Sequence, residues 1–195
     1  MSLDEYIKHA DLLPLQIWDI AKGRLQQVFD GHQQEIYSLD FSRDGRLIIS
    51  GSGDKTVRIW DLYDKFHNVL TISDNNGIGD PGVTSVTISP DATLVAAGSL
   101  DNSVRIWDVA SGTLLERLQG YEDGIYSVVF TPDGKGLVSG SLDNSVKYWD
   151  VSVLAAGSAK SKPENATPTP TFSGSSSSSD TSVVPCTMDF VGHDR

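Results

Sequence analysis

The first candidates for chemistry are a histidine, a serine and an aspartate in the first third of the chain. His32, Ser50 and Asp54 are the residue types of a hydrolase triad, in which the histidine takes the serine proton and a carboxylate orients the histidine. The same residue types return at matching places further along the chain, whereas a nucleophile needs one poised site. We therefore expect structural roles for these three residues and no enzyme activity.

Phosphate and metal chemistry are not supported by the spacing of the remaining residues. The Gly-Ser-Gly-Asp-Lys-Thr run at 51–56 lacks the Gly-Lys-Ser/Thr that follows four spacers in a phosphate-binding loop, and it opens a strand rather than a helix. The four histidines show no ligand spacing with cysteine or acidic residues: His9, His32, His67 and His193. No metal and no cofactor are expected.

Charge and composition limit the partners. Fifteen Lys and Arg against 26 Asp and Glu give a formal net charge of −11, and no basic cluster offsets it. Phosphate backbones would be repelled, so direct nucleic-acid binding is not expected. Cys186 is the single thiol and forms no internal disulfide. Without a signal peptide or a run of about 18 apolar residues, we expect a soluble intracellular protein with no membrane partner.

Internal repetition is the strongest signal in the sequence. The chain contains four Trp-Asp pairs: Trp18-Asp19, Trp60-Asp61, Trp107-Asp108 and Trp149-Asp150. The tryptophans stand 42, 47 and 42 residues apart, near the ~40–45 residues of WD40 repeats. The last three pairs each end a segment that is nearly the same in all three repeats: SGSGDKTVRIWD, AGSLDNSVRIWD and SGSLDNSVKYWD. Gly-His pairs at 31–32 and 192–193 open repeats, as they do in WD40 proteins.

Short segments with period-two alternation lie between these landmarks and predict strands. In the first full repeat the strands are expected at about 35–41, 46–51, 56–61 and 68–72, with Asp-Gly and Pro-Asp turns between them in this and later repeats. Four strands form one propeller blade. The predicted fold is all-β: an incomplete WD40 β-propeller of about three four-stranded blades plus half of a preceding one.

The chain divides into four predicted parts. Residues 1–14 form a non-repeat segment, and residues 15–151 hold the WD40 blades. The Ser/Thr/Pro-rich stretch at 152–182 is expected to be a disordered insertion, because it has too few apolar residues to order itself. Residues 183–195 should supply the outer strand of the last blade and the start of the next repeat. Since propellers close with about four to eight blades, we expect a fragment or, alternatively, a chain that self-associates.

The motifs identify the chain as a member of the WD40 family, and this resemblance implies a hydrogen-bond network in each blade. The tryptophan N–H bonds a serine on the second strand, which is linked to the histidine of Gly-His and the aspartate of the turn. In the first full repeat these would be Trp60, Ser50, His32 and Asp54. The matching residues elsewhere are Asp101, Trp107, Ser139, Asp143 and Trp149.

The network is incomplete in the later repeats. Ala97 replaces the serine in the middle repeat, which also lacks a Gly-His pair, and Tyr121 replaces the histidine in the last repeat. We therefore expect one well-networked blade and two blades held mainly by apolar packing.

A narrower resemblance concerns the fungal Tup-type general transcriptional corepressor. The segments that are similar to its WD40 domain are 34–40, 47–62, 95–101, 115–118, 125–131 and 139–147, and the Ser/Thr-rich insertion lies where that family has one. The resemblance covers about 16–195. It implies a nuclear scaffold that is recruited by DNA-bound repressors and that holds a TPR corepressor partner through a helical region absent here.

The same resemblance implies a partner-binding role for two tyrosines. Tyr37 and Tyr126 each stand 23 residues before a repeat tryptophan, and Thr84 holds that position in the middle repeat. Exposed tyrosines are rigid anchors at interfaces, whereas the alternative is that both merely pack beside the central channel. For the whole chain, the alternative function is a WD40 adaptor or substrate receptor of a ubiquitin ligase or another cytoplasmic complex.

Overall fold

The computed structural model describes residues 14–63, 70–72, 82–157 and 186–191, and almost all of them lie in strands or in the turns between strands. The first sheet pairs β1 (Leu15–Asp19) with β2 (Arg24–Phe29). The next contains β3 (Ile36–Phe41), β4 (Leu47–Ser52), β5 (Val57–Asp61) and β6 (Leu70–Ile72). A third contains β7 (Val83–Ile88), β8 (Leu94–Ser99), β9 (Val104–Asp108) and β10 (Leu114–Leu118). The last contains β11 (Ile125–Phe130), β12 (Gly136–Ser141), β13 (Ser145–Asp150) and β14 (Cys186–Val191).

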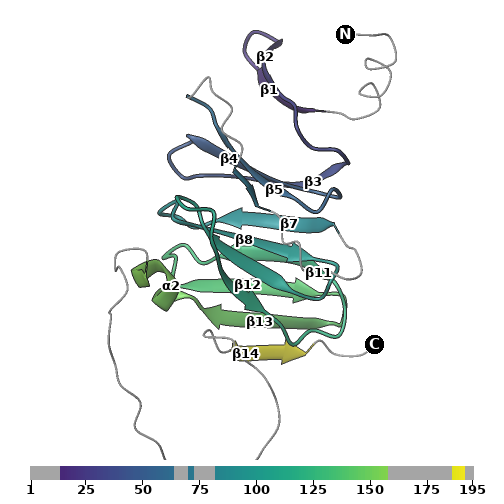
Figure 1. The fold of residues 1–195 in the computed structure, drawn as a ribbon, viewed down its shortest axis with the longest axis vertical. Coiled ribbons are helices and arrows are strands. Elements are labelled where there is room, and N and C mark those ends of the chain that lie inside the picture. Colours follow the sequence, from purple (N-terminus) through teal and green to yellow (C-terminus); the bar gives the residue numbers. More distant parts are fainter. Residues whose placement is uncertain (1–13, 64–69, 73–81, 158–185, 192–195) are drawn as a thin grey trace, which may run out of the picture.

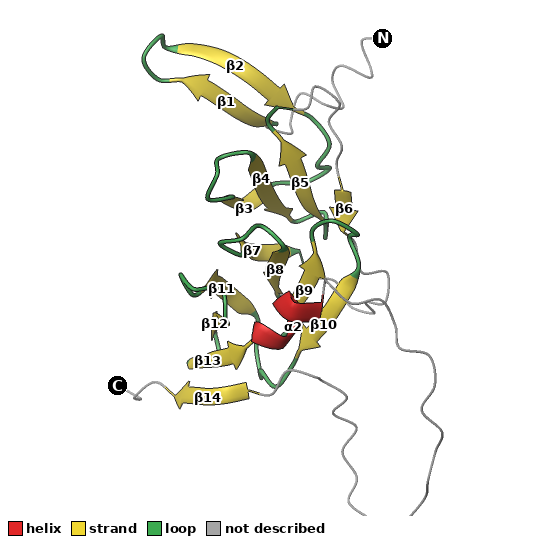
Figure 2. Cartoon of the chain, turned by 90° about the vertical axis from the view of Figure 1, so that its left-hand side faces the viewer, coloured by secondary structure: helices red, strands yellow, loops and turns green. Residues whose placement is uncertain are grey.

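Each four-stranded sheet is an antiparallel meander, in which consecutive strands are neighbours. The sheets follow one another along the long axis of the molecule (Figure 1). Their first strands, β3, β7 and β11, lie next to one another on one side (Figure 2). This arrangement confirms the predicted fold class: three propeller blades, preceded by the outer half of another.

A tryptophan fills the space between each pair of neighbouring sheets. Trp60 packs with Leu15 and Phe29 of the two-stranded sheet. Trp107 packs with Ile49 and Ile59 of the first blade, and Trp149 packs against residues of the second blade, among them Leu94, Ile106 and Leu118. These three indoles are at most 4% exposed, whereas Trp18 is 55% exposed. The repeat tryptophans thus form the apolar layers that hold the blades together.

Polar side chains on the innermost strands also link the blades. The backbone N–H of Val86 donates to Ser38 Oγ at 3.0 Å, and that of Ile88 donates to Asp40 Oδ2 at 2.9 Å. One blade further on, the N–H of Val128 donates to Ser85 Oγ at 3.1 Å. These bonds satisfy backbone donors on a strand edge that faces the preceding blade rather than a paired strand, and they fix the relative positions of β3, β7 and β11.

The segment after β13 differs from its prediction at its start. A short helix, α2 (Ser152–Gly157), occupies the first residues of the stretch that was expected to be disordered. The Asp150 carboxylate accepts hydrogen bonds from both the backbone N–H and the hydroxyl of Ser152, and Leu154 packs on the apolar layer of the last blade. Residues 158–185 lie outside the described residues. Beyond them, β14 pairs antiparallel with β13 and completes that blade.

Among the described residues, no helix is long and apolar enough to cross a membrane.

Candidate protein-binding groove

An open groove of about 520 Å³ lies where the innermost strands of the three blades begin. Its lining residues are Gln34, Tyr37, Gly53, Gly82, Thr84, Leu100 and Tyr126. Because β7 lies between β3 and β11, the equivalent positions of three repeats, Tyr37, Thr84 and Tyr126, meet at one place. The two tyrosines are 62% and 56% exposed, so most of each side chain is open to a partner.

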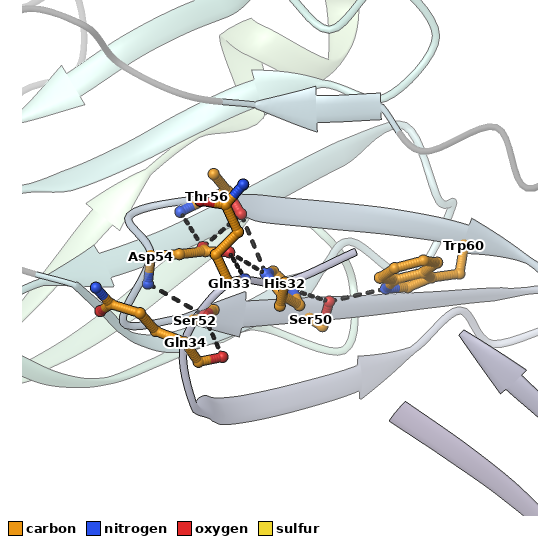
Figure 3. Close-up of polar contacts among 8 residues, drawn as sticks. All are labelled: His32, Gln33, Gln34, Ser50, Ser52, Asp54, Thr56 and Trp60. Carbon is orange, nitrogen blue, oxygen red and sulfur yellow. Dashed lines mark hydrogen bonds and ion pairs between the residues drawn. The ribbon is translucent and has the colours of Figure 1, made fainter. Parts of the chain in front are cut away.

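The loop that enters β3 is anchored to the turn between β4 and β5. Ser52 Oγ donates to the carbonyl of Gln34 at 3.1 Å, and the N–H of Gly53 donates to the carbonyl of Glu35 at 2.9 Å. The N–H of Gln33 donates to Asp54 Oδ2 at 2.8 Å (Figure 3). These bonds hold the backbone that carries Gln34 and, two residues later, Tyr37.

The loop that enters β11 is held in the same way. The N–H of Glu122 donates to Asp143 Oδ2 at 2.9 Å, and Ser141 Oγ donates to the carbonyl of Asp123 at 2.9 Å. The N–H of Leu142 donates to the carbonyl of Gly124. The loop before Tyr126 is therefore held by hydrogen bonds equivalent to those that hold the loop before Tyr37.

Two groove residues join neighbouring blades. The hydroxyl of Thr84 lies within hydrogen-bond distance of the carbonyls of Gly98 in its own blade and Ile125 in the next. A Cβ at Gly82 would lie 2.6 Å from Gly53 Cα, so the loops of two blades approach too closely for a side chain there. A Cβ at Gly53 would lie 3.2 Å from Tyr37 Cε2. The groove is thus built by contacts between blades and not by one blade alone.

Behind the groove, a chain of hydrogen bonds connects the loop to the blade core (Figure 3). Trp60 Nε1 donates to Ser50 Oγ at 2.8 Å, Ser50 Oγ lies 2.7 Å from His32 Nε2, and His32 Nδ1 lies 2.9 Å from Asp54 Oδ2. A neutral histidine protonated on Nδ1 satisfies every link, because Nδ1–H donates to the carboxylate and Nε2 accepts the serine proton. Thr56 Oγ1 donates to the other oxygen of Asp54 at 2.6 Å.

The electrostatics agree with this protonation state. Burial lowers the pKa of His32 below its ordinary value of 6.5, although the Asp54 carboxylate acts in the opposite direction. For Asp54, burial alone would raise the pKa, but hydrogen bonds from Thr56, Gln33 and His32 outweigh it and lower the pKa. A neutral imidazole beside an ionised carboxylate is therefore the favoured state near neutral pH.

The geometry leaves these residues no room to act as a hydrolase triad. Ser50 is fully buried, and its oxygen already accepts the proton of Trp60. The His32 side chain is 3% exposed, so no substrate carbonyl can approach the serine or the histidine in this arrangement.

The last blade contains the indole-to-serine hydrogen bond that the family resemblance implies, extended by Tyr121 in place of the histidine. Tyr121 O–H is hydrogen-bonded to Ser139 Oγ, and Trp149 Nε1 donates to both oxygens at 3.0 Å. Trp149 also lies in a buried apolar cluster, so the blade combines apolar packing with this network. A tyrosine hydroxyl can take the place of the histidine because it acts both as donor and as acceptor. Lys147 lies with its Nζ 5.3 Å from the centre of the Tyr121 ring.

The middle blade has an ionic network in addition to the apolar packing around Trp107. Arg105 donates to both oxygens of Asp101, at 3.2 and 2.6 Å, and Arg117 donates to the same carboxylate at 3.1 Å. Ser103 Oγ donates to Asp101 Oδ1 at 2.6 Å. Although burial opposes it, these partners lower the pKa of Asp101. The turn aspartate is thus kept in place by arginines, in a repeat without the histidine and the serine.

Comparison with known proteins identifies the class. The family described as "WD domain, G-beta repeat" matches residues 23–61, 69–108 and 112–150, which together make up more than half of the chain. The chain belongs to the WD40-repeat family.

Individual relatives have different names and match short stretches. A periodic tryptophan protein 2 homolog of Schizosaccharomyces pombe is 40% identical over 28% of this chain and 6% of its own length. The peroxisomal targeting signal 2 receptor of Mus musculus is 53% identical over 24% of this chain and 16% of its own length. The U3 small nucleolar RNA-associated protein 12 of Saccharomyces cerevisiae is 40% identical over 32% of this chain and 6% of its own length. The chain therefore spans only a small part of these relatives.

The sequence singled out two of the residues that line the groove as binding residues, Tyr37 and Tyr126, and noted Thr84 as their counterpart. It missed Gln34, Gly53, Gly82 and Leu100. Aligning the repeats shows that Leu100 and Gly53 occupy the same turn position, so both would have been found together had that turn been considered. No pattern in the sequence marks Gln34 or Gly82, since their place in the groove depends on how neighbouring blades meet.

Proposed function

We propose that this WD40 chain is a non-catalytic scaffold that binds a partner protein in the groove, with Tyr37 and Tyr126 as the main contact residues. The observation that carries the proposal is that two largely exposed tyrosines from different blades line one open groove. Tyrosine offers a large contact area with few rotatable bonds, and it dominates binding energy at many interfaces. The anchored loops hold the backbone before both tyrosines in place before the partner arrives, which reduces the entropy lost on binding.

The more specific role that we propose is that of a nuclear transcriptional corepressor that docks DNA-bound repressors. It rests on the similarity of 34–40 and 125–131 to the Tup-type propeller, segments that carry Tyr37 and Tyr126. A nuclear location also fits the name of the yeast relative associated with a small nucleolar RNA. The alternative, an adaptor or receptor of another complex, is favoured by the match to a peroxisomal targeting signal receptor.

Affinity capture from extracts of the source cells tests the proposal. The full chain, the double variant Tyr37→Ala/Tyr126→Ala and the control Tyr63→Ala should all show cooperative thermal unfolding. Tyr63 is 76% exposed and follows β5, at the end of the strands opposite the groove. We expect the wild type and the control to retain a set of proteins that the double variant loses at least tenfold.

The identity of the lost proteins separates the two roles. DNA-binding repressors among them would support the corepressor, whereas ubiquitin-ligase or other cytoplasmic subunits would support the adaptor. If the wild type, the double variant and the Tyr63→Ala control all retained the same set of captured proteins, the partner surface would lie outside the groove and the proposal would be wrong.

A further inference from the structure

The charge of the molecule is unevenly distributed around the groove. The described loops at the groove end are 30–35, 53–56, 100–103, 119–124 and 142–144. Among their carboxylates, those of Asp30, Glu35, Glu122 and Asp123 belong to exposed residues, and the single Lys or Arg in these loops is Lys55. At the other end of the strands, the described turns mix carboxylates with the basic residues Lys22, Arg43, Arg46 and Lys135.

Several other aspartates at the groove end are already engaged in structural bonds. Asp54 bonds His32, and Asp101 is held by two arginines. The exposed acids of these loops outnumber their one basic residue, Lys55, and therefore favour a negative field at the groove end. A field of this kind attracts cations and repels phosphates and acidic segments.

The lining of the groove suits a cation with an apolar stem. Tyr37 and Tyr126 offer aromatic rings, whose faces attract guanidinium and ammonium groups. Between them Thr84 already directs its hydroxyl at the backbone carbonyls of Gly98 and Ile125, so it has no donor left that would repel a cation. Leu100, 42% exposed, adds an apolar surface for the methylene groups of a long side chain.

We propose that the groove binds a basic linear peptide segment, with one arginine or lysine side chain placed over Thr84 between Tyr37 and Tyr126. The inference rests on the proposed function and specifies the chemistry of the partner segment. The small residue in the middle repeat is what makes the site: a third tyrosine in place of Thr84 would fill the space that the cationic side chain occupies.

Fluorescence anisotropy with three dye-labelled octapeptides tests the inference on the full chain. The peptides share a Gly/Ser/Leu sequence and differ in carrying three arginines, three glutamines or three glutamates. We expect the arginine peptide to bind at least tenfold more tightly than the other two, and its affinity to fall as salt is raised from 50 to about 200 mM because the attraction is screened. Equal binding of the three peptides, tighter binding of the glutamate peptide, or no binding of the arginine peptide would overturn the inference.

Three variants locate the site without relying on the tyrosines. Leu100→Lys should weaken binding of the arginine peptide at least fivefold and Leu100→Glu should strengthen it, because both remove the same apolar surface and differ in the charge that they place at the groove wall. Thr84→Tyr should abolish binding, with its thermal midpoint reported alongside because Thr84 also links two blades. Unchanged affinity in both Leu100 variants would contradict the placement.

The outcomes distinguish the inference from the proposed function. If the arginine peptide fails to bind but protein capture still depends on Tyr37 and Tyr126, the partner is not basic and the groove remains the docking site. If capture does not depend on the tyrosines, the proposed function fails, whatever the peptides do.

Discussion

Tyr37 and Tyr126 line one groove, although the whole second blade separates them in the sequence. They meet because β7 lies between β3 and β11, joined by the bonds from Val86 to Ser38 and from Val128 to Ser85. The loop before each tyrosine is tied to the neighbouring turn by equivalent hydrogen bonds. The binding site that we propose is therefore a property of three consecutive blades, and changes that separate the blades should weaken it.

Ser50→Ala should destabilise the chain. The substitution removes the only oxygen to which Trp60 Nε1 is seen to donate and leaves His32 Nε2 without its donor, in a fully buried place. Leaving such groups unsatisfied costs about 1–3 kcal/mol of unfolding free energy, measured by urea denaturation. The control Ser111→Ala, at an exposed position, should change it by less than about 0.5 kcal/mol. Equal effects of the two substitutions would contradict the network.

Tyr121→Phe should have a smaller effect of the same sign. The hydroxyl that this substitution removes is hydrogen-bonded to Ser139 and Trp149, but Trp149 Nε1 keeps Ser139 Oγ as an acceptor at 3.0 Å. We expect a loss of about 1 kcal/mol. Ser139→Ala in the same blade should cost more, because it takes the serine oxygen away from the buried Tyr121 hydroxyl and also removes the hydrogen bond from Ser139 Oγ to the Lys147 carbonyl. A Tyr121→Phe variant as stable as the wild type would show that the tyrosine contributes by packing alone.

Asp101→Asn should be the most damaging of these changes. It removes the charge that compensates Arg105 and Arg117, and Arg105 is 7% exposed. Removing one partner of a buried ion pair costs about 3 kcal/mol or more. Glu35→Gln removes the same charge from an exposed side chain and should be nearly neutral in thermal denaturation. If Asp101→Asn lowered the thermal midpoint no more than Glu35→Gln does, solvent would already screen the ion pairs of Asp101 with the two arginines.

Stability should fall as the pH drops through about 6.5. Because the pKa of His32 is lower in the folded chain, the unfolded chain binds more protons, so the free energy of unfolding rises with pH across this region. One proton contributes at most about 1.4 kcal/mol per pH unit. Urea denaturation between pH 7 and 5 should show a steeper loss for the wild type than for His32→Gln. The other three histidines are present in both proteins, so their titration cancels; parallel pH profiles would contradict the assignment of this effect to His32.

The fold was predictable because its signals repeat. The Trp-Asp spacing fixed the number of blades, and turn residues marked the strands to within about two residues of Ile36–Phe41 and Leu47–Ser52. The repeat places Tyr121 where the first repeat has His32 and so indicates that it lies near Ser139, whereas nothing in the sequence near Arg105 shows that it reaches Asp101. Ser139 lies on β12 and Asp101 in the turn between β8 and β9, and both contacts depend on the register of the sheet and the packing of the blades.

The most direct test of the groove uses one captured partner in purified form. Isothermal titration calorimetry should give its dissociation constant for the wild-type chain, for Tyr63→Ala and for Tyr37→Ala/Tyr126→Ala. Since truncating a central interface residue costs about 2 kcal/mol or more, we predict at least 30-fold weaker binding to the double variant and no change for Tyr63→Ala. Binding of the double variant within twofold of the wild type would contradict a binding site at the two tyrosines.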